Sequence, residues 1–407
     1  GASVYFDNKD INNPNRYLYG TYSASPSANP WSDVKEQEKI EYNNNGYVKW
    51  YGAFTQLEYS NDNLSAFFQG AVSQQGFQRE DTFLYKTTDP LYKTDFENIL
   101  GGNVKGGVNY NLNEQHNVFV NSGYYSKQPF FNAVYPNNKS LVGENINKEK
   151  ILGVEAGYGF RSKMFNAKLN LYYTSWKDRY QRSNDASPTN VGGYYDFTGI
   201  TEIHSGVELE MNSRPLPKLS LNAMISVGNW EYEGNSTSNR YDANNNPIGG
   251  GTSTTLYLDG VKVGDAAQTT ASIGASYEVL TRVFLDANYR VSENLYASID
   301  PSRFNSATNK GTLELPSYGL MDAGFSYKML VGKNNSNSLN FRLNVNNVLD
   351  EVYISESRTN IFADDYVSGT SGPTWASSGQ TYKGVANKNQ VFFGYGRTWN
   401  FSLRYNF

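Results

Sequence analysis

The sequence of 407 residues has no cysteine and only two histidines, His116 and His204. These absences exclude disulfide bonds, thiol chemistry and any His-rich metal site within the chain. No stretch approaches the ~18 consecutive apolar residues of a transmembrane helix. The 35 basic and 39 acidic side chains nearly cancel to a net charge of −4 and form no basic cluster, so binding to nucleic acid is not expected.

Aromatic residues are plentiful, at 15% of the chain, although only 38% of all residues are hydrophobic. Disordered chains are poor in aromatic residues, so this composition predicts a folded protein. The dominant pattern is an alternation of apolar and polar residues: from Trp399 to Phe407, every second residue is apolar and the residues between are polar. Such segments, of about 12–16 residues with charged polar faces, favour an all-β transmembrane barrel with lipid outside and water inside.

Thirteen segments show this alternation and are predicted to be antiparallel strands. They cover residues 47–59, 63–75, 99–112, 117–127, 150–160, 164–177, 197–212, 218–231, 267–279, 282–294, 317–330, 338–351 and 391–407. Short turns alternate with long connections, and the long ones are residues 76–98, 128–149, 178–196, 232–266, 295–316 and 352–390. Outer-membrane barrels have short periplasmic turns and long extracellular loops. We therefore predict an extracellular loop at 1–46 and part of an outer-membrane barrel at 47–407.

The strand count is odd, whereas bacterial single-chain barrels have an even number of strands. The first predicted strand also begins on the side of the long loops. A barrel made of these segments alone would leave two unpaired strand edges in lipid, where each unpaired backbone group costs several kcal/mol. We therefore expect the missing strands on another polypeptide or in a part of the protein that precedes this chain. A miscount by one strand is the alternative.

Four stretches carry a resemblance to a known family. They are residues 341–353 (FRLNVNNVLDEVY), 396–407 (GRTWNFSLRYNF), the hairpin of 51–59 (YGAFTQLEY) with 64–68 (LSAFF), and 124–131 (YYSKQPFF). In this order, and together with the alternation of loop lengths, they resemble the C-terminal part of a TonB-dependent outer-membrane transporter of the type found in Bacteroidetes. The resemblance spans almost the whole chain.

The resemblance implies a barrel of about 22 strands filled by an N-terminal plug domain, with this chain supplying its last strands. It implies import of a scarce nutrient: a ferric siderophore, an oligosaccharide, a peptide or a vitamin. The implied partners are the plug and the remaining barrel strands, the TonB–ExbB–ExbD complex that supplies energy, outer-membrane lipid and, in this lineage, often a surface lipoprotein lid. It also implies that the terminal aromatic residue, Phe407, helps the barrel-insertion machinery to recognise the last strand.

Aromatic residues on the long-loop side are the candidate ligand contacts. They are Tyr124, Tyr125, Phe130, Phe131, Tyr135, Trp230, Tyr232, Trp375 and Tyr382. Ring faces near a barrel mouth can stack on sugar, catecholate or peptide groups, with polar neighbours supplying hydrogen bonds. The alternative interpretation is that these rings pack the loops against one another.

Two further sets follow from the alternation. Aromatic residues of the expected membrane interfaces are Tyr158, Phe160, Tyr277, Tyr289, Tyr327, Trp399, Tyr405 and Phe407. Polar residues expected to face the lumen and contact a plug are Glu155, Lys168, Glu202, His204, Glu208, Glu210, Asp286, Arg290, Asp322, Lys328, Arg342 and Arg404.

Neither set provides a catalytic group, so no enzyme, cofactor or metal site is predicted. A passive diffusion porin is the alternative function, and an outer-membrane protease or lipase is a third, for which no nucleophile or acid–base set is found.

Overall fold

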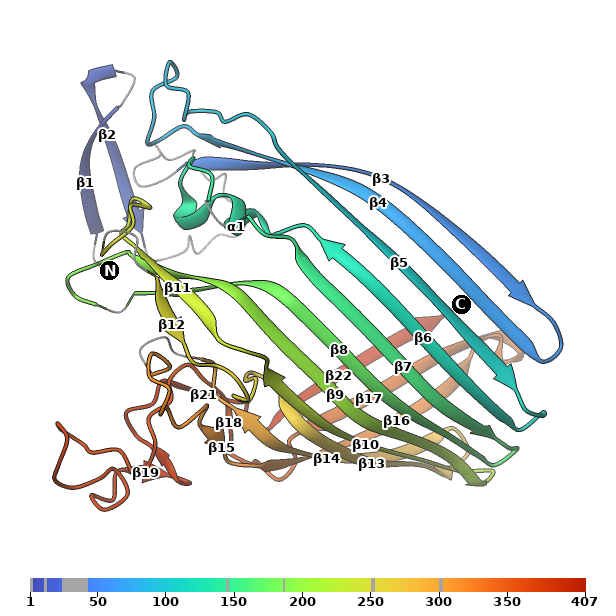
Figure 1. Cartoon of the computed structure of the whole chain (residues 1–407). Coiled ribbons are helices and arrows are strands. Elements are labelled where there is room, and N and C mark those ends of the chain that lie inside the picture. The colour runs from blue at the N-terminus through green and yellow to red at the C-terminus, as the bar shows by residue number, and fades with distance from the viewer. Residues whose placement is uncertain are drawn as a thin grey trace.

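The described chain consists mostly of antiparallel strands (Figure 1). This computed structural model describes residues 3–10, 13–23, 43–143, 146–185, 187–249, 253–299 and 303–407. Thirteen long strands form one sheet, in which each long strand pairs with the next one along the chain. They are β3 (Asn44–Ser60), β4 (Leu64–Asp81), β5 (Glu97–Asn111), β6 (His116–Lys127), β7 (Glu149–Arg161), β8 (Phe165–Asn184), β9 (Tyr194–Leu216), β10 (Leu219–Tyr232), β13 (Ala267–Leu280), β14 (Val283–Tyr296), β16 (Tyr318–Val331), β17 (Asn337–Asn346) and β22 (Thr398–Asn406).

Each of these thirteen strands overlaps one predicted segment, and the predicted all-β antiparallel fold is confirmed. The last strand was predicted to begin at residue 391, but β22 begins at Thr398, and β21 (Val391–Phe393) is a separate strand that pairs with a loop strand.

The main differences are in length. β8 and β9 remain paired beyond the predicted ends, where Arg182 lies opposite Asp196. The alternation that identifies a strand depends on apolar residues two apart. Here the buried apolar residues of β9 are Tyr194, Phe197 and Ile200, which are three apart.

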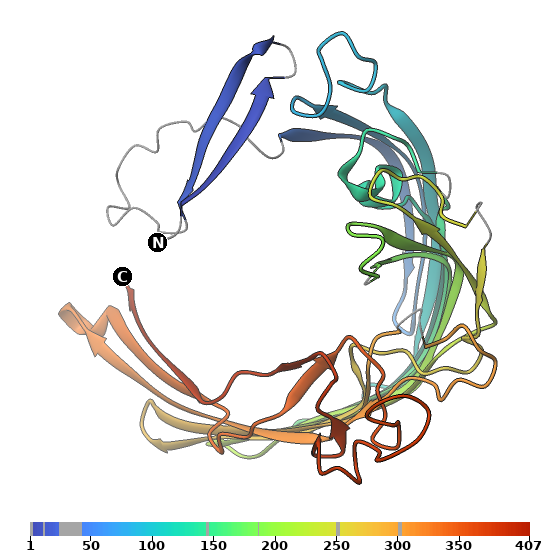
Figure 2. The ribbon, with the colours of Figure 1, turned by 90° about the vertical axis from the view of Figure 1, so that its left-hand side faces the viewer.

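The sheet curves into an open arc, as Figure 2 shows. Within the described residues, the two end strands β3 and β22 each pair with a single neighbour and not with each other. A separate antiparallel hairpin is formed by β1 (Ser3–Asp10) and β2 (Asn13–Ser23). This hairpin falls in the segment predicted as an extracellular loop, and residues 24–42 of that segment lie outside the described residues.

Short turns gather at one end of the arc and long loops at the other (Figure 1). The long-loop end contains the small strands β11 (Ser236–Tyr241), β12 (Thr254–Leu256), β15 (Glu314–Leu315), β18 (Ile354–Ser357), β19 (Thr381–Tyr382), β20 (Val385–Ala386) and β21 (Val391–Phe393). The helices are α1 (Phe131–Val134), η1 (Pro136–Asn138) and η2 (Lys333–Asn335), and α1 lies on the concave side of the sheet (Figure 2). No helix among the described residues has the length and apolar character needed to cross a membrane.

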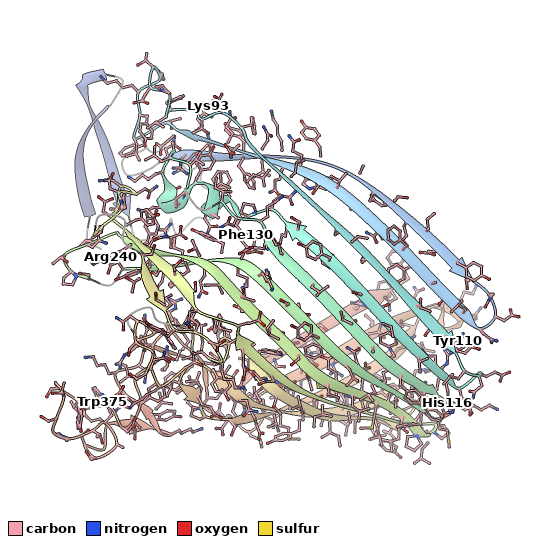
Figure 3. The ribbon with its side chains drawn as sticks, viewed as in Figure 1. Lys93, Tyr110, His116, Phe130, Arg240 and Trp375 are labelled. Atoms are coloured by element: carbon pink, nitrogen blue, oxygen red, sulfur yellow. The ribbon has the colours of Figure 1, made fainter. Side chains whose placement is uncertain are left out.

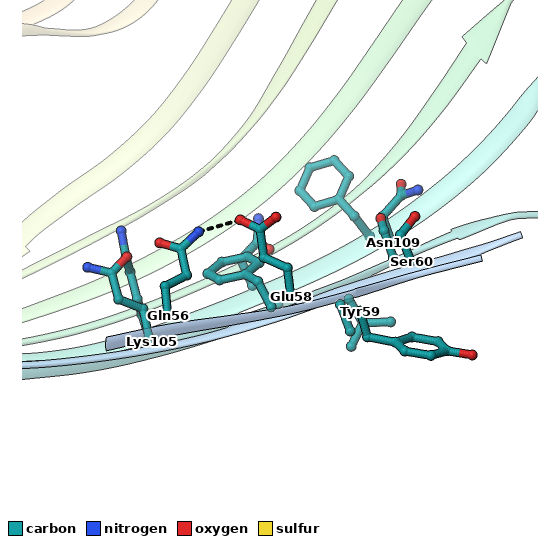
Figure 4. A pocket seen from close by; sticks show the side chains of 14 residues that line it. Gln56, Glu58, Tyr59, Ser60, Lys105 and Asn109 are labelled. Atoms are coloured by element: carbon teal, nitrogen blue, oxygen red, sulfur yellow. Dashed lines mark hydrogen bonds between the residues drawn. The ribbon is translucent and has the colours of Figure 1, made fainter. Parts of the chain in front are cut away.

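The two faces of the long strands differ in polarity. Apolar side chains such as Val120, Leu171 and Ile225 are 54%, 49% and 43% exposed on the convex face. Polar side chains alternate with them and face the concave side. Figure 4 shows this for Glu58 and Tyr59, which point to opposite sides of β3. The strand half of the molecule therefore has its apolar surface outside and its polar surface inside, which is the reverse of a soluble protein.

Apolar cores of the ordinary kind lie in the long-loop half. The largest consists of Phe197, Ile200, Tyr232, Leu256, Leu258, Val261, Val263, Ile299 and Phe304. A second consists of Leu295, Ala297, Leu313, Leu315, Ile354 and Val385, and a third of Phe77, Val134 and Tyr135. These cores connect loops that are far apart in the sequence, so the loop half is a packed structure rather than a set of separate loops.

Candidate functional site

The concave wall of the arc carries hollows in its short-turn half. One hollow of about 710 Å³ is lined by Gln56, Glu58, Lys105 and Asn109 among others (Figure 4). A second, of about 550 Å³, brings Lys168 of β8 together with Glu208 and Glu210 of β9. Three of the residues predicted to face the lumen therefore line one hollow on the concave side.

Other predicted luminal residues pair with each other. Arg342 of β17 donates from Nη2 to Asp286 Oδ1 of β14 at 2.8 Å, and the bond passes over Gly324 of the intervening strand β16. An added Cβ at Gly324 would lie 2.6 Å from Asp286 Oδ1. Arg290 and Asp322 form a second ion pair nearby. Part of the charge on this wall is therefore neutralised within the wall itself.

A charged and aromatic cluster lies at the long-loop end of the concave face. Because Lys168 and Asn170 line a concave hollow, alternation along β8 places Tyr172 and Trp176 on the same side. Trp176 lies opposite Glu202 of β9, and a register shift after Trp176 brings Arg179 back toward the pair. Glu202 is 1% exposed, forms an ion pair with Arg179 and shares a hydrogen bond of 3.0 Å with Nε2 of His204. A buried carboxylate needs such partners, because an unpaired charge in this position is costly.

The ring of His204 stacks on Trp230 of β10, with centroids 5.1 Å apart and planes at 19°. Trp230 in turn donates from Nε1 to the Tyr172 hydroxyl at 2.9 Å. Gln268 of β13 accepts from the Trp230 backbone N–H at 2.9 Å and donates to its carbonyl at 2.9 Å. The imidazole is thus fixed between a carboxylate at its edge and an indole at its face.

Lys127, the last residue of β6, extends the cluster toward the loops. Its ammonium lies 2.7 Å from Glu149 Oε2, 4.0 Å from the ring centroid of Phe130 and 5.4 Å from that of Trp176. The Arg179 guanidinium lies 4.4 Å from the same Trp176 ring. We call Lys127, Trp176, Arg179, Glu202, His204 and Trp230 the mouth cluster. Its cations are paired with carboxylates, so the cluster can hold a ligand by stacking and hydrogen bonding.

The structure separates the aromatic residues predicted to contact ligand. Tyr125 shares the concave face with Phe119, whereas Tyr124 is 44% exposed on the opposite, convex face with Val120. Phe130 is 55% exposed at the long-loop end (Figure 3) and is the member placed beside the mouth cluster.

Three other members of the set pack inside the loop half. Phe131 contacts Tyr135, with ring centroids 5.3 Å apart, and Phe77, with centroids 6.1 Å apart. Tyr135 is 2% exposed, its hydroxyl lies 2.8 Å from Thr94 Oγ1, and burial raises its pKa. Trp375 lies at the long-loop end (Figure 3) and is 7% exposed. This is the arrangement that the loop-packing interpretation describes.

The remaining three members also lie at the long-loop end. Trp230 belongs to the mouth cluster, Tyr232 is buried in the largest core, and Tyr382 contacts Phe393 with ring centroids 5.6 Å apart. Phe407 is 98% exposed beyond β22, and its predicted part in assembly stays a prediction.

Buried polar contacts fasten the inward-folded loop 128–143 that carries α1. Arg79, 2% exposed, forms an ion pair of 3.0 Å with Asp81 and donates to the Asn138 carbonyl at 2.6 Å. Asn137 accepts from Arg182 at 2.7 Å and donates to the Ala243 carbonyl at 2.7 Å. The loop 128–143 is therefore attached to the ends of β4 and β8 and to the loop that contains Ala243.

Trp176 and Arg179 were not among the predicted site residues, and Glu202 and His204 were predicted only to face the lumen. The only signal in the sequence is that Trp176 continues the polar, concave-facing series of β8. In the part of the chain that the structure describes, no three His, Asp or Glu side chains gather as a metal site.

The sequence matches one known protein family. Residues 3–348 match the family described as TonB dependent receptor-like, beta-barrel. No curated protein matches the sequence.

Solved structures show the same fold. The siderophore receptor PiuA from Acinetobacter baumannii is 16% identical, with a TM-score of 0.59 over 89% of this chain and 44% of that one. The copper transporter OprC is 14% identical, with a TM-score of 0.58 over 89% and 48%. The ferric citrate transporter FecA is 13% identical, with a TM-score of 0.57 over 96% and 49%. The chain spans about half the length of these structures.

Proposed function

The chain belongs to the TonB-dependent receptor β-barrel family, and from this premise we propose that it forms the C-terminal part of the wall of an outer-membrane nutrient importer. The family consists of outer-membrane receptors and transporters and not of enzymes. The observation that carries the proposal is the reversed polarity of the strand half: apolar side chains lie on the convex face, and charged side chains such as Glu58, Lys105 and Glu208 line the concave one. The family match does not favour the passive porin.

In this proposal the rest of the protein supplies the remaining strands and a plug, residues 1–46 form an extracellular loop, and the TonB–ExbB–ExbD complex supplies energy. The open arc, with unpaired outer edges on β3 and β22 among the described strands, supports additional strands. The four stretches quoted above support a Bacteroidetes-type member, in which a surface lipoprotein lid is a further partner.

The mouth cluster is the proposed first contact for ligand, together with Tyr125 and Phe130. Its stacked rings and fixed charges face the lumen at the end where a solute would enter. The ligand classes are those that the resemblance implies: a ferric siderophore, an oligosaccharide, a peptide or a vitamin. The similar solved structures include a siderophore receptor and transporters of copper and ferric citrate, which supports the metal-chelate class.

The test is uptake by cells that carry the full-length protein. A panel of ferric siderophores, cobalamin, oligosaccharides and peptides is offered to a deletion strain and to the complemented strain, with and without a protonophore. We expect one compound to enter only with the protein and only while the inner membrane is energised. Trp176→Ala should lower that uptake at least tenfold, whereas Tyr173→Ala, on the convex face of the same strand, should not. Uptake that survives the protonophore would indicate a passive pore.

A further inference from the structure

Four aromatic side chains line the concave wall between the mouth cluster and the short turns. They are Phe67 of β4, Phe119 and Tyr125 of β6, and Tyr172 of β8. Phe67 and Phe119 line the hollow of about 710 Å³ (Figure 4), and the Tyr172 hydroxyl accepts the hydrogen bond from Trp230 of the mouth cluster. Tyr125 shares the concave face of β6 with Phe119. We call these four side chains the wall rings.

Each wall ring lies over a glycine of the sheet. An added Cβ on Gly206 would lie 2.6 Å from the Tyr172 hydroxyl oxygen, and one on Gly107 would lie 2.7 Å from the Phe67 ring. The same close approach occurs at two further positions, Gly157 beneath Phe119 and Gly123 beneath Tyr125. Glycine weakens the interior of a strand and often marks a place that a ligand approaches closely. Here it leaves room for the rings to lie against the wall, with one face toward the lumen.

Phe119 stands where three hollows of the concave wall adjoin. It lines the hollows of about 710 and 550 Å³ and a third of about 450 Å³. The second and third hollows also share Lys168 and Glu210. The wall rings therefore lead from the mouth cluster into one continuous recess of the short-turn half.

The charges that line these three hollows balance. Three carboxylates occur with three basic groups: Glu58, Glu208 and Glu210 with Lys105, Arg161 and Lys168. Amide side chains line every hollow, for example Asn109, Asn170 and Asn117. Such a surface offers donors and acceptors of hydrogen bonds but no excess of either charge. It therefore suits a neutral, hydroxyl-bearing ligand better than a highly charged chelate.

The spacing of the wall rings suits a ligand with several rings of its own. Tyr172 is paired with Glu155 of β7, and Phe119 is paired with Gly157 of the same strand. The two aromatic residues therefore lie two strands apart and two residues apart along the sheet, which separates their backbones by a distance on the order of 12 Å. A single small ring cannot contact both, whereas successive rings of an oligosaccharide can.

We propose that the wall rings and the three hollows bind a neutral oligosaccharide on its way from the mouth to the short-turn end. The inference rests on the proposed function and names its substrate class. The apolar faces of sugar rings stack on aromatic rings, and sugar hydroxyl groups bond to amides and carboxylates. The copper and ferric citrate transporters named above are 14% and 13% identical to this chain and share only its fold, so they do not decide the ligand of this wall.

The first experiment is uptake by cells that carry the full-length protein. Maltohexaose, mannohexaose and xylohexaose are offered beside ferric siderophores and cobalamin. We expect one oligosaccharide to enter while the inner membrane is energised. Phe119→Ala should lower its uptake at least fivefold, and Phe119→Tyr, which keeps a ring, should not. Val120→Ala, on the convex face of the same strand, is the control and should leave uptake unchanged.

The outcomes separate this inference from the proposed function. Energy-dependent uptake of a ferric siderophore or cobalamin, and of no oligosaccharide, would overturn the inference and leave the proposed function intact. Oligosaccharide uptake that is unchanged in Phe119→Ala would overturn the inference as well. The absence of energy-dependent uptake of any compound would instead refute the proposed function.

Thiol protection tests for direct contact in the purified full-length protein. This chain has no cysteine of its own, so Phe119→Cys places a new thiol in the recess. We expect the transported oligosaccharide to slow the labelling of this thiol by a maleimide at least fivefold. Labelling of Ser326→Cys, on the concave face of β16, should not be slowed. Equal protection at both positions, or none at Phe119→Cys, would show that the ring packs against protein and does not contact the ligand.

Discussion

The strand half and the loop half of this protein place apolar residues in opposite ways. In the strand half, Leu171 and Ile225 are exposed on the convex face while Asn170 and Glu208 face the concave side. In the loop half, apolar residues are buried instead of exposed. Phe304, for example, lies in a core and is 1% exposed. Each half is consistent with its own solvent: lipid around the strands and water around the loops. The position of an apolar residue therefore identifies which solvent surrounds it.

The largest loss of stability is expected when a buried aromatic ring of the loop half is removed. Phe304→Ala leaves a cavity in the largest core and should destabilise the loop half by about 3–5 kcal/mol. Hydrogen exchange of residues 253–299 in the full-length protein measures it. Val191→Ala, at a loop residue that is 82% exposed, is the control and should change little. If the two variants changed the hydrogen exchange equally, the core around Phe304 would not stabilise the loop half.

A charge on the convex face should reveal the lipid. Leu171→Arg should destabilise the protein in a bilayer by about 2–4 kcal/mol, because the charge must enter the hydrocarbon region. Asn170→Arg, one residue earlier and on the concave face, should have little effect. Reversible unfolding of the full-length protein in vesicles compares the two. If Asn170→Arg were the more harmful variant, the assignment of the faces would be wrong.

A smaller loss of stability is expected when a polar contact inside a loop core is removed. Tyr135→Phe removes the hydroxyl that bonds Thr94 Oγ1 and keeps the ring, so it should cost about 1 kcal/mol. The loss should appear as faster hydrogen exchange in residues 128–143. Tyr110→Phe, at a strand residue that is 45% exposed, is the matched change in the other half and should be neutral. A neutral Tyr135→Phe would mean that the hydroxyl adds nothing to the packed ring.

The smallest effect concerns pH. Burial raises the pKa of Asp365, but hydrogen bonds from Lys310 and from the Phe362 N–H outweigh it, and the pKa is lowered. A lowered pKa means that the contribution of this carboxylate is present above its ordinary pKa and is lost as the pH falls through the lowered one. We expect at most about 1 kcal/mol, because Lys310 is 45% exposed. Hydrogen exchange of residues 352–390 should accelerate below about pH 4.

Asp365→Asn should make that acceleration disappear. Asp364 also pairs with Lys310 but is 75% exposed, so Asp364→Asn should keep most of the acceleration. If both variants lost the acceleration equally, the pH dependence would come from the charge of Lys310 and not from Asp365 in particular.

The strand half was predictable because its solvent imposes a period of two on the sequence. From Trp399 to Phe407 that period is uninterrupted, and the number and order of the long strands follow from thirteen such segments. The inward fold of α1 was not predictable in this way. Its position depends on a buried Arg79 and on a backbone carbonyl of Asn138, and neither contact leaves a periodic trace.

The mouth cluster was predictable only in part. Glu202 and His204 share a face because they are two residues apart on a strand. Their partner Arg179 reaches them through a register shift after Trp176. A register shift is set by the pairing of two strands and has no signature in one of them. The location of Tyr135 and Trp375 inside the loop half likewise depends on contacts between distant loops.

The ion pair over Gly324 has a consequence for assembly. Asp286 and Arg342 belong to strands two apart, so their contact fixes the alignment of three strands at once. A slip of β16 by one residue would turn Ala323 or Phe325 toward the ion pair, where there is no room for a Cβ. Only the native alignment of β16 therefore places a residue without a side chain beneath this ion pair.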